Sequence, residues 1–167
     1  MRDDAESNAR LSRKRLVPSR DTAMSQQPTS TPSTPRLHGA CLCGTVHYEV
    51  SCEIVSVSHC HCSMCRKFHG AAFATYGNVP RQHFRYVKGQ DAVRDFESSP
   101  GVKRSFCANC GASLTWSDDR YANEIAFALG TLETPVSQLP GLRHIYVASK
   151  APWYEITDSL PRFDKDN

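Results

Sequence analysis

The chain has 167 residues, with 20 Lys or Arg against 17 Asp or Glu, which gives a formal net charge of +3. This length suits one domain that buries its own hydrophobic core without covalent staples throughout. Residues 1–36 carry seven basic and four acidic residues, which accounts for the whole excess of positive charge. The remainder is electrically balanced, so we expect no basic face for nucleic acid.

The first segment, 1–36, is rich in Ser, Thr, Pro, Gln and Arg and poor in branched apolar residues. Such a segment cannot bury enough surface to fold, which predicts a disordered, basic tail. Its basic run at 13–15 is either a solvated charge run or a weak nuclear-import element that would engage chromatin. We find no apolar stretch of the kind that a secretory signal or a membrane span requires, and we therefore expect a cytoplasmic protein without a membrane partner. Met24 is an alternative start.

From residue 37 onward, short alternating segments are broken by Gly, Pro, Asn and Asp. This pattern predicts a mainly β, single domain over 37–163, followed by a short tail at 164–167. In the first clear strand, Val46, Tyr48 and Val50 share one face. The segments with similar texture are 45–50, 54–58, 72–76, 84–87, 93–97, 103–106, 124–129 and 144–149.

Helical signals are sparse. Ser63 is a candidate cap for a single turn at 64–68, and a second turn at 135–139 is followed by the stop signal Gly141. Neither is long enough to organise the fold.

Cysteine is the unusual feature of the composition. Seven of the eight cysteines form three local sets: Cys41 with Cys43, Cys60 with Cys62 and Cys65, and Cys107 with Cys110. Cysteines one or two residues apart are poor disulfide partners but good chelators, because both thiolates reach one ion. In a reducing compartment the thiols also stay free. Metal binding is therefore favoured over disulfides, and the isolated Cys52 is expected to be a plain, partly buried thiol.

Two of the sets end in glycine, Cys41-Leu42-Cys43-Gly44 and Cys107-Ala108-Asn109-Cys110-Gly111. Glycine accepts the positive φ that a sharp turn between two converging thiolates demands. Four thiolates close a tetrahedral shell and leave no position for substrate. We therefore expect Cys41, Cys43, Cys107 and Cys110 to hold a structural zinc.

The third set, His59-Cys60-His61-Cys62-Ser63-Met64-Cys65, offers three cysteines without an obvious fourth partner. On an extended segment, Cys60 and Cys62 share one face, and the following turn returns Cys65 to the same ion. This predicts an open zinc site with three thiolates. The alternative is a closed site in which His59 or His61 supplies the fourth ligand.

The chain also resembles a known family over about 37–163. The matching residues, in order, are His38-Gly39-Ala40-Cys41-Leu42-Cys43-Gly44, Cys60-His61-Cys62-Ser63-Met64-Cys65-Arg66-Lys67, Ser98-Ser99-Pro100, Phe106-Cys107-Ala108-Asn109-Cys110-Gly111, His144-Ile145, Lys150-Ala151-Pro152-Trp153 and Asp158. This series is similar to the glutathione-dependent formaldehyde-activating enzyme family, which includes centromere protein V.

The resemblance implies a β-tent fold with two zinc ions, one structural and one catalytic, the latter on Cys60, Cys62 and Cys65. It also implies a carbon–sulfur lyase-type activity, the condensation of glutathione or a similar small thiol with formaldehyde or another small electrophile to S-(hydroxymethyl)glutathione. A zinc ion with three thiolates favours sulfur as its next ligand, which suits that chemistry. The alternative is a non-catalytic zinc module that carries glutathione or binds a protein. The sequence does not determine the oligomeric state.

Glutathione carries two carboxylates, so cationic side chains near the open site are expected to bind it. We expect Arg66 to be the first of these, with Lys67, Lys150 and Arg104 as further candidates, and each has an ordinary surface charge as its alternative. The aromatic candidates for an apolar wall are Trp153 and Phe68, which are equally compatible with core positions. His144 is a candidate proton shuttle, or else a structural histidine.

Overall fold

The computed structural model describes residues 36–166, so the predictions for the tail, the basic run at 13–15 and Met24 lie outside the described residues. The chain folds into a mainly β domain with a single α-helix in this range. The strands are β1 Leu37–Ala40, β2 His47–Val50, β3 Ser56–Cys60, β4 Ala74–Pro80, β5 Phe84–Lys88, β6 Val93–Ser99, β7 Val102–Cys107, β8 Ser113–Asp118, β9 Glu124–Ala128 and β10 Arg143–Ile145. The helix is α1, Ser63–His69, and 3₁₀ turns occupy Arg81–His83, Gln90–Ala92, Asp119–Tyr121, Leu129–Thr131 and Val147–Ser149. Between residues 36 and 166, no helix is both long and apolar enough to cross a membrane.

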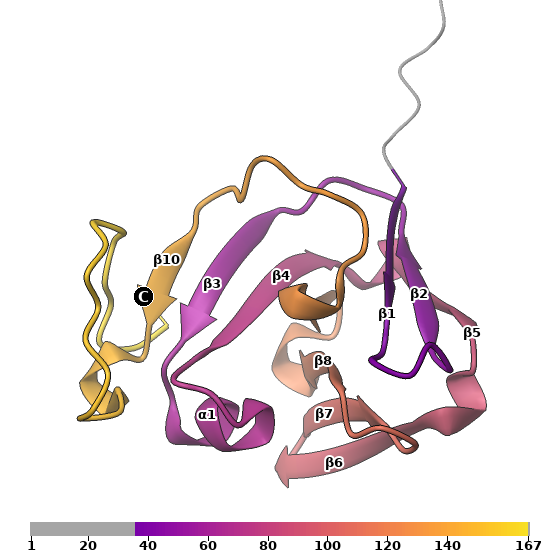
Figure 1. Cartoon of the computed structure of the whole chain (residues 1–167), viewed down its shortest axis with the longest axis horizontal. Helices are drawn as coiled ribbons and strands as arrows, with labels where there is room; N and C mark the ends of the chain where they lie inside the picture. The colour runs from indigo at the N-terminus through magenta and orange to yellow at the C-terminus, as the bar shows by residue number, and fades with distance from the viewer. Residues whose placement is uncertain (1–35, 167) are drawn as a thin grey trace, which may run out of the picture. The chain divides into compact units, whose positions relative to one another are not determined.

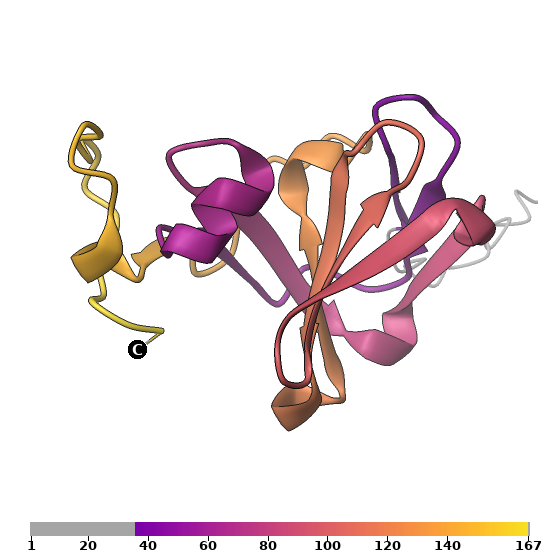
Figure 2. The ribbon, with the colours of Figure 1, turned by 90° about the horizontal axis from the view of Figure 1, so that it is seen from below.

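The strands form two sheets (Figure 1). The smaller has the order β1-β2-β5, and the larger has the order β10-β3-β4-β9-β8-β7-β6. All strand pairs are antiparallel except β10 with β3, which are parallel. Helix α1 and the C-terminal segment lie at one end of the domain, away from β1 and β2 (Figure 2).

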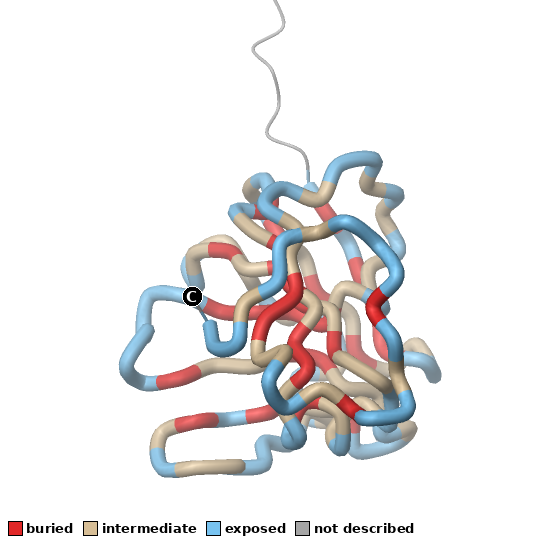
Figure 3. Tube along the Cα trace, turned by 90° about the vertical axis from the view of Figure 1, so that its left-hand side faces the viewer, coloured by how far each residue is buried: buried red, intermediate tan, exposed pale blue. Residues whose placement is uncertain are grey.

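The hydrophobic core lies between the two sheets, where the buried parts of the trace gather (Figure 3). The predicted face of the first strand is confirmed, since Val46, Tyr48 and Val50 are each 0% exposed. Tyr48 and Val50 pack with Val57, Phe127 and other apolar residues of the larger sheet, and Val46 packs with Leu114 and Cys107. The close approach of the strands requires glycine at position 39, where a Cβ would lie 2.2 Å from the Tyr48 ring.

Most expected strands are present, although their limits move by a few residues. The sequence pattern did not predict β1, which leads into the first cysteine turn, or β8, which follows the second. The helix is confirmed, but its N-cap is Cys62 rather than Ser63, because the Cys62 sulfur accepts the Cys65 N–H at 3.3 Å. The helix predicted at 135–139 is wrong, since this segment is irregular.

The C-terminal segment runs beside β10. The His144 N–H donates to Pro161 O at 2.8 Å, and the Tyr146 N–H donates to Lys165 O at 3.2 Å. Backbone pairing therefore continues into the stretch that the sequence assigned to a tail at 164–167.

Candidate metal centres and active site

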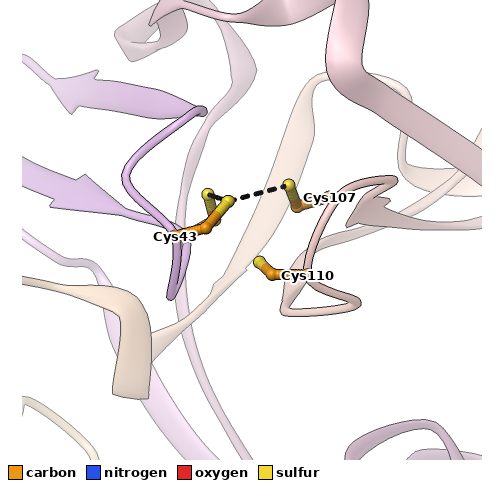
Figure 4. Close-up of side chains that lie close together, drawn as sticks. Cys43, Cys107 and Cys110 are labelled. Carbon is orange, nitrogen blue, oxygen red and sulfur yellow. Dashed lines mark hydrogen bonds between the residues drawn. The ribbon is translucent and has the colours of Figure 1, made fainter.

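Four cysteines from two distant turns converge at one end of the sheets (Figure 4). Cys41 and Cys43 lie in the β1–β2 turn, Cys107 ends β7, and Cys110 lies in the β7–β8 turn. Their sulfurs are all within 4.8 Å of one another. The Sγ atoms of Cys41 and Cys43 are 3.5 Å apart, and those of Cys43 and Cys107 are 3.9 Å apart.

The local turns explain this convergence. Gly44 and Gly111 have φ of 69° and 73°, in the left-handed region that the sequence analysis expected of them. Their N–H groups donate to Cys41 O at 3.0 Å and to Cys107 O at 2.8 Å, which closes each turn. The Val46 N–H also donates to Cys41 Sγ at 3.2 Å, which fixes the position of this sulfur.

The four-cysteine cluster fits a tetrahedral metal. Zinc–sulfur bonds of about 2.3 Å place the sulfurs of such a shell about 3.8 Å apart, close to the observed separations. A disulfide would need about 2.05 Å, and all eight cysteines are free. Hydrogen bonds with the side chain and backbone of Thr45 lower the pKa of Cys43 to about 6, so the ligand form is available at neutral pH.

The second cluster joins the end of β3 to the start of α1. Cys60 is the last residue of β3, Cys62 caps the helix, and Cys65 lies in its first turn. The three sulfurs are within 4.8 Å of one another. Hydrogen bonds from the Cys60 and Cys65 thiols, aided by the Cys65 N–H and the charge of Arg104, hold the pKa of Cys62 well below its usual value. Cys62 therefore readily forms a thiolate, whereas hydrogen bonds with Cys62 and Cys65 raise the pKa of Cys60. The three sulfurs together could hold one metal ion with a position left for another ligand.

Both histidines of the motif stay outside this cluster. In residues 36–166, the groups of side chains that could hold a metal contain cysteines alone. His59 Nδ1 bonds Thr75 Oγ1 at 2.8 Å, and His61 Nε2 bonds His144 Nδ1 at 2.8 Å. The structure thus favours three sulfur ligands over a histidine-completed shell.

A cavity of about 1010 Å³ opens beside the three-cysteine cluster. It lies over the face of the larger sheet opposite the core, because its strand residues alternate with core residues such as Val57 and Phe127. The small side chain of Ala126 lies on this face between Asn78 and Trp116, its neighbours on β4 and β8, and leaves room above the sheet. The principal polar and aromatic lining residues are Ser58, Cys60, Cys62, Cys65, Tyr76, Asn78, Arg104, Trp116, Asp118, Arg120, Tyr121, Glu124, Arg143, Tyr146 and Asp166.

Arg104 connects this cavity to the cysteine cluster. It is only 3% exposed, and its Nη1 donates to Cys65 Sγ at 3.5 Å. Its Nε donates to Ser98 Oγ at 3.0 Å, and its guanidinium carbon lies 5.8 Å from the centroid of the Phe68 ring. A buried guanidinium needs an opposite charge, and the thiolates provide it. Arg104 and Phe68 thus form one unit at the site, although the sequence ranked Arg66 above Arg104.

His144 belongs to a separate buried chain of side chains. It is 1% exposed and lies between His61 and Asp158, whose two carboxylate oxygens are each 3.1 Å from His144 Nε2. Burial lowers the pKa of His61 to about 4, so this imidazole is neutral. His144 does not line the cavity. Its role as a proton shuttle stays a prediction.

Apart from Arg104, the residues expected to bind substrate lie outside the cavity lining. Arg66 donates to His61 O at 3.3 Å and Ser149 O at 3.4 Å, which ties α1 to the segment after β10. Lys67 is exposed, and Lys150 Nζ donates to the carbonyl oxygens of Ala151 and Tyr154. Trp153 is 72% exposed. Substrate binding by Arg66, Lys67, Lys150 and Trp153 stays a prediction.

Other residues that line the cavity were not predicted from the sequence, notably Tyr76, Trp116, Arg120 and Arg143. They come from four different segments, and none belongs to a cysteine motif. Only the strand register brings them together, because Arg143 pairs with Ser58, which in turn pairs with Tyr76. No local signal in the sequence could have found this set.

Comparison with known proteins agrees with these cysteine clusters. The family model of the glutathione-dependent formaldehyde-activating enzyme matches residues 36–149. A Schizosaccharomyces pombe protein named an uncharacterized lyase is 31% identical over 80 residues, which span 48% of this chain and only 56% of that protein. A Halomonas elongata protein named a putative glutathione-dependent formaldehyde-activating enzyme is 26% identical over 127 residues, or 72% of this chain and 80% of that protein.

One solved structure is similar to this chain in fold. The crystal structure of a Rhodobacter sphaeroides protein has 25% sequence identity and a TM-score of 0.51, covering 60% of this chain and 91% of that one. The family match covers both cysteine clusters and the strands that hold them. The chain belongs to the glutathione-dependent formaldehyde-activating enzyme family, as its cysteine motifs predicted.

Proposed function

We propose that the protein condenses a glutathione-type thiol with formaldehyde or another small aldehyde at the cluster of Cys60, Cys62 and Cys65. In this reaction the thiol sulfur bonds to the carbonyl carbon, and the thiol proton passes to the carbonyl oxygen. The observation that carries the proposal is that all three cysteines face the same cavity of about 1010 Å³. A cavity of this size holds a peptide thiol together with a small carbonyl compound.

The proposal includes two zinc ions and a division of labour between them. The four-cysteine cluster completes a shell by itself, which supports a structural role. Zinc on the three-cysteine cluster would supply a soft Lewis acid that keeps an incoming thiol in its thiolate form. The β-tent arrangement expected from the family is part of the same proposal, and the three- and seven-stranded sheets support it.

Arg104 has a defined task in this scheme. Three thiolates and a divalent metal leave a net negative charge, which opposes the approach of a further thiolate. The buried guanidinium, bonded to Cys65 Sγ at 3.5 Å, offsets that charge from inside the protein. Its bond to Ser98 and its position over Phe68 fix it there, so it does not need to reorganise during the reaction.

The test is exchange NMR on an equilibrium mixture of glutathione and formaldehyde with substoichiometric protein. We expect the zinc-loaded wild type to accelerate interconversion of glutathione and its hydroxymethyl adduct. Cys62→Ser should remove the acceleration, while Cys52→Ser is the matched control, because Cys52 lies in neither cluster.

Two other results would contradict the enzymatic proposal. Depletion of free glutathione in proportion to protein, without any change in rate, would identify a carrier instead. Full acceleration by Cys62→Ser would move the reaction away from this cluster.

A further inference from the structure

Arg143 is a cavity cation that has no acidic partner among the described residues. It starts β10, lines the cavity, and donates from Nη1 to Gly141 O at 3.2 Å. Within residues 36–166 its Nε is buried without any hydrogen-bond partner, and none is found for Nη2. The Nε–Nη2 edge of this guanidinium is therefore unused.

The other two arginines of the cavity are already engaged. Arg104 bonds Ser98 and Cys65, and Arg120 forms an ion pair with the buried Asp118, with Nη2 and Oδ2 2.5 Å apart. The remaining acidic residues of the lining, Glu124 and Asp166, make no ion pair with Arg143.

An unpaired, buried N–H group is costly in free energy and rare in folded proteins. The two parallel donors of a guanidinium edge match the two oxygens of a carboxylate. A carboxylate that enters the cavity would satisfy both Nε and Nη2 after a small rotation of the side chain, at no loss of an existing bond from either nitrogen. The chemistry thus calls for a carboxylate ligand.

The strand register sets the distance from this arginine to the cysteine cluster. Arg143 pairs with Ser58, and Ile145 pairs with Cys60, so Arg143 lies two residues along the sheet from Cys60. All four residues line the cavity and hence share one face. Two residues of parallel strand correspond to about 6.6 Å along the strand, and the step to the neighbouring strand adds about 4.8 Å across the sheet, so the Cα atoms of Arg143 and Cys60 are about 8 Å apart.

A peptide thiol has matching dimensions. In an extended Cys-Gly unit, six covalent bonds join the cysteine sulfur to the glycine carboxylate carbon, and these two atoms are about 7 Å apart. With its sulfur at the three-cysteine cluster, such a ligand would bring its glycine carboxylate to the start of β10.

We propose that Arg143 is the specificity-determining residue that binds the C-terminal carboxylate of the thiol co-substrate. This inference rests on the proposed function, since the sulfur must sit at Cys60, Cys62 and Cys65. The site then selects a thiol whose carboxylate lies one residue beyond the reacting cysteine, and discriminates against thiols that lack it.

A two-by-two comparison of protein and ligand tests the assignment. The zinc-loaded full chain and its Arg143→Gln variant are titrated by calorimetry with glutathione and with its glycine ethyl ester, which masks only that carboxylate. We expect the wild type to bind the acid ten- to a hundredfold more tightly than the ester. Arg143→Gln should weaken binding of the acid by a similar factor and leave binding of the ester within twofold.

The ester serves as the internal control for folding, because its unchanged affinity reports an intact site. Arg94→Gln is the matched charge control, since Arg94 is exposed and outside the cavity lining, and this variant should bind both ligands as the wild type does. Equal affinity of the wild type for acid and ester, or equal weakening of both by Arg143→Gln, would overturn the role of Arg143 while leaving the proposed reaction intact. Failure of the wild type to bind either ligand at millimolar concentration would overturn both.

Discussion

Replacing Cys107 by serine tests whether the four-cysteine cluster supports the fold. Cys107 is 0% exposed and packs with Val46 and Leu114. Its sulfur lies 3.9 Å from that of Cys43, which is 64 residues earlier in the chain. The cluster therefore joins the early β1–β2 turn to the late β7–β8 turn.

The size of the effect follows from the metal's share of the folding free energy. A structural zinc contributes on the order of 10 kcal/mol, whereas the net stability of a domain is about 5–15 kcal/mol. Loss of one thiolate in four removes at least ~2.5 kcal/mol of this, and the buried serine hydroxyl costs ~1–3 kcal/mol more. We expect Cys107→Ser to be destabilised by about 4 kcal/mol or more, and to be unfolded or aggregated once a chelator removes the weakened metal.

Urea unfolding followed by circular dichroism, with zinc content measured on the same samples, checks this expectation. Cys62→Ser should stay folded and lose one equivalent of zinc, because its cluster borders a cavity instead of joining the two turns. A Cys107→Ser protein whose free energy of unfolding lies within 1 kcal/mol of that of the zinc-loaded wild type would refute the structural role of the cluster.

Three further predictions follow from the surroundings of the site and the core. Arg104→Gln should weaken the binding of thiol to the zinc-loaded protein by about tenfold, because it loses a charged hydrogen bond worth ~1.5–3 kcal/mol. Arg104→Lys should recover part of the lost affinity. Calorimetry measures both affinities, and an unchanged affinity of Arg104→Gln would contradict the role of Arg104 in offsetting the charge of the cluster. Burial lowers the pKa of His69 to about 4 in the folded chain, whereas the pKa of this histidine in the unfolded chain is about 6.5. As the pH falls, His69 is therefore protonated in the unfolded chain before it is protonated in the folded chain. His69 therefore reduces stability as the pH falls from about 6.5 to 4 and has no effect above that window, and the difference in unfolding free energy between wild type and His69→Gln should change only there. Gly39→Ala should destabilise the domain by ~1–3 kcal/mol or more, because the new Cβ would lie 2.2 Å from the Tyr48 ring. Gly130→Ala is the control, because a Cβ at this position would have no atom within 4 Å. Equal thermal midpoints of the two variants would contradict this prediction and show that the strands move apart readily.

Local sequence was enough for the features that depend on spacing along the chain. The C-x-C and C-x-x-C sets with their following glycines indicated two sharp turns, and Gly44 and Gly111 have the positive φ that this reasoning required. The alternation in 45–50 placed Val46, Tyr48 and Val50 in the core, where all three are fully buried. The separation of the cysteines into a group of four and a group of three also matches the observed clusters.

The capping of α1 shows where local rules fail. Serine is the usual choice as an N-cap, so Ser63 was expected to start the helix. The Cys62 sulfur takes that place because the chain must bring Cys62 and Cys65 together, and the same geometry aims the Cys65 N–H at Cys62. The requirement of the cysteine cluster thus overrides a propensity worth about 1 kcal/mol.

The sequence by itself determined the family, the mainly β character and the grouping of the cysteines. Short motifs and local alternation encode the first two. The two glycine-ended cysteine pairs lie 64 residues apart, and they were grouped because a closed tetrahedral shell needs four thiolates. The walls of the cavity were decided only by tertiary structure. Arg104, Arg143 and Tyr76 come from strands far apart in the chain, and the register of the larger sheet alone puts them on one face beside the cysteines. Register depends on how the two sheets bury their apolar faces against each other, a property of the whole core that no local pattern contains.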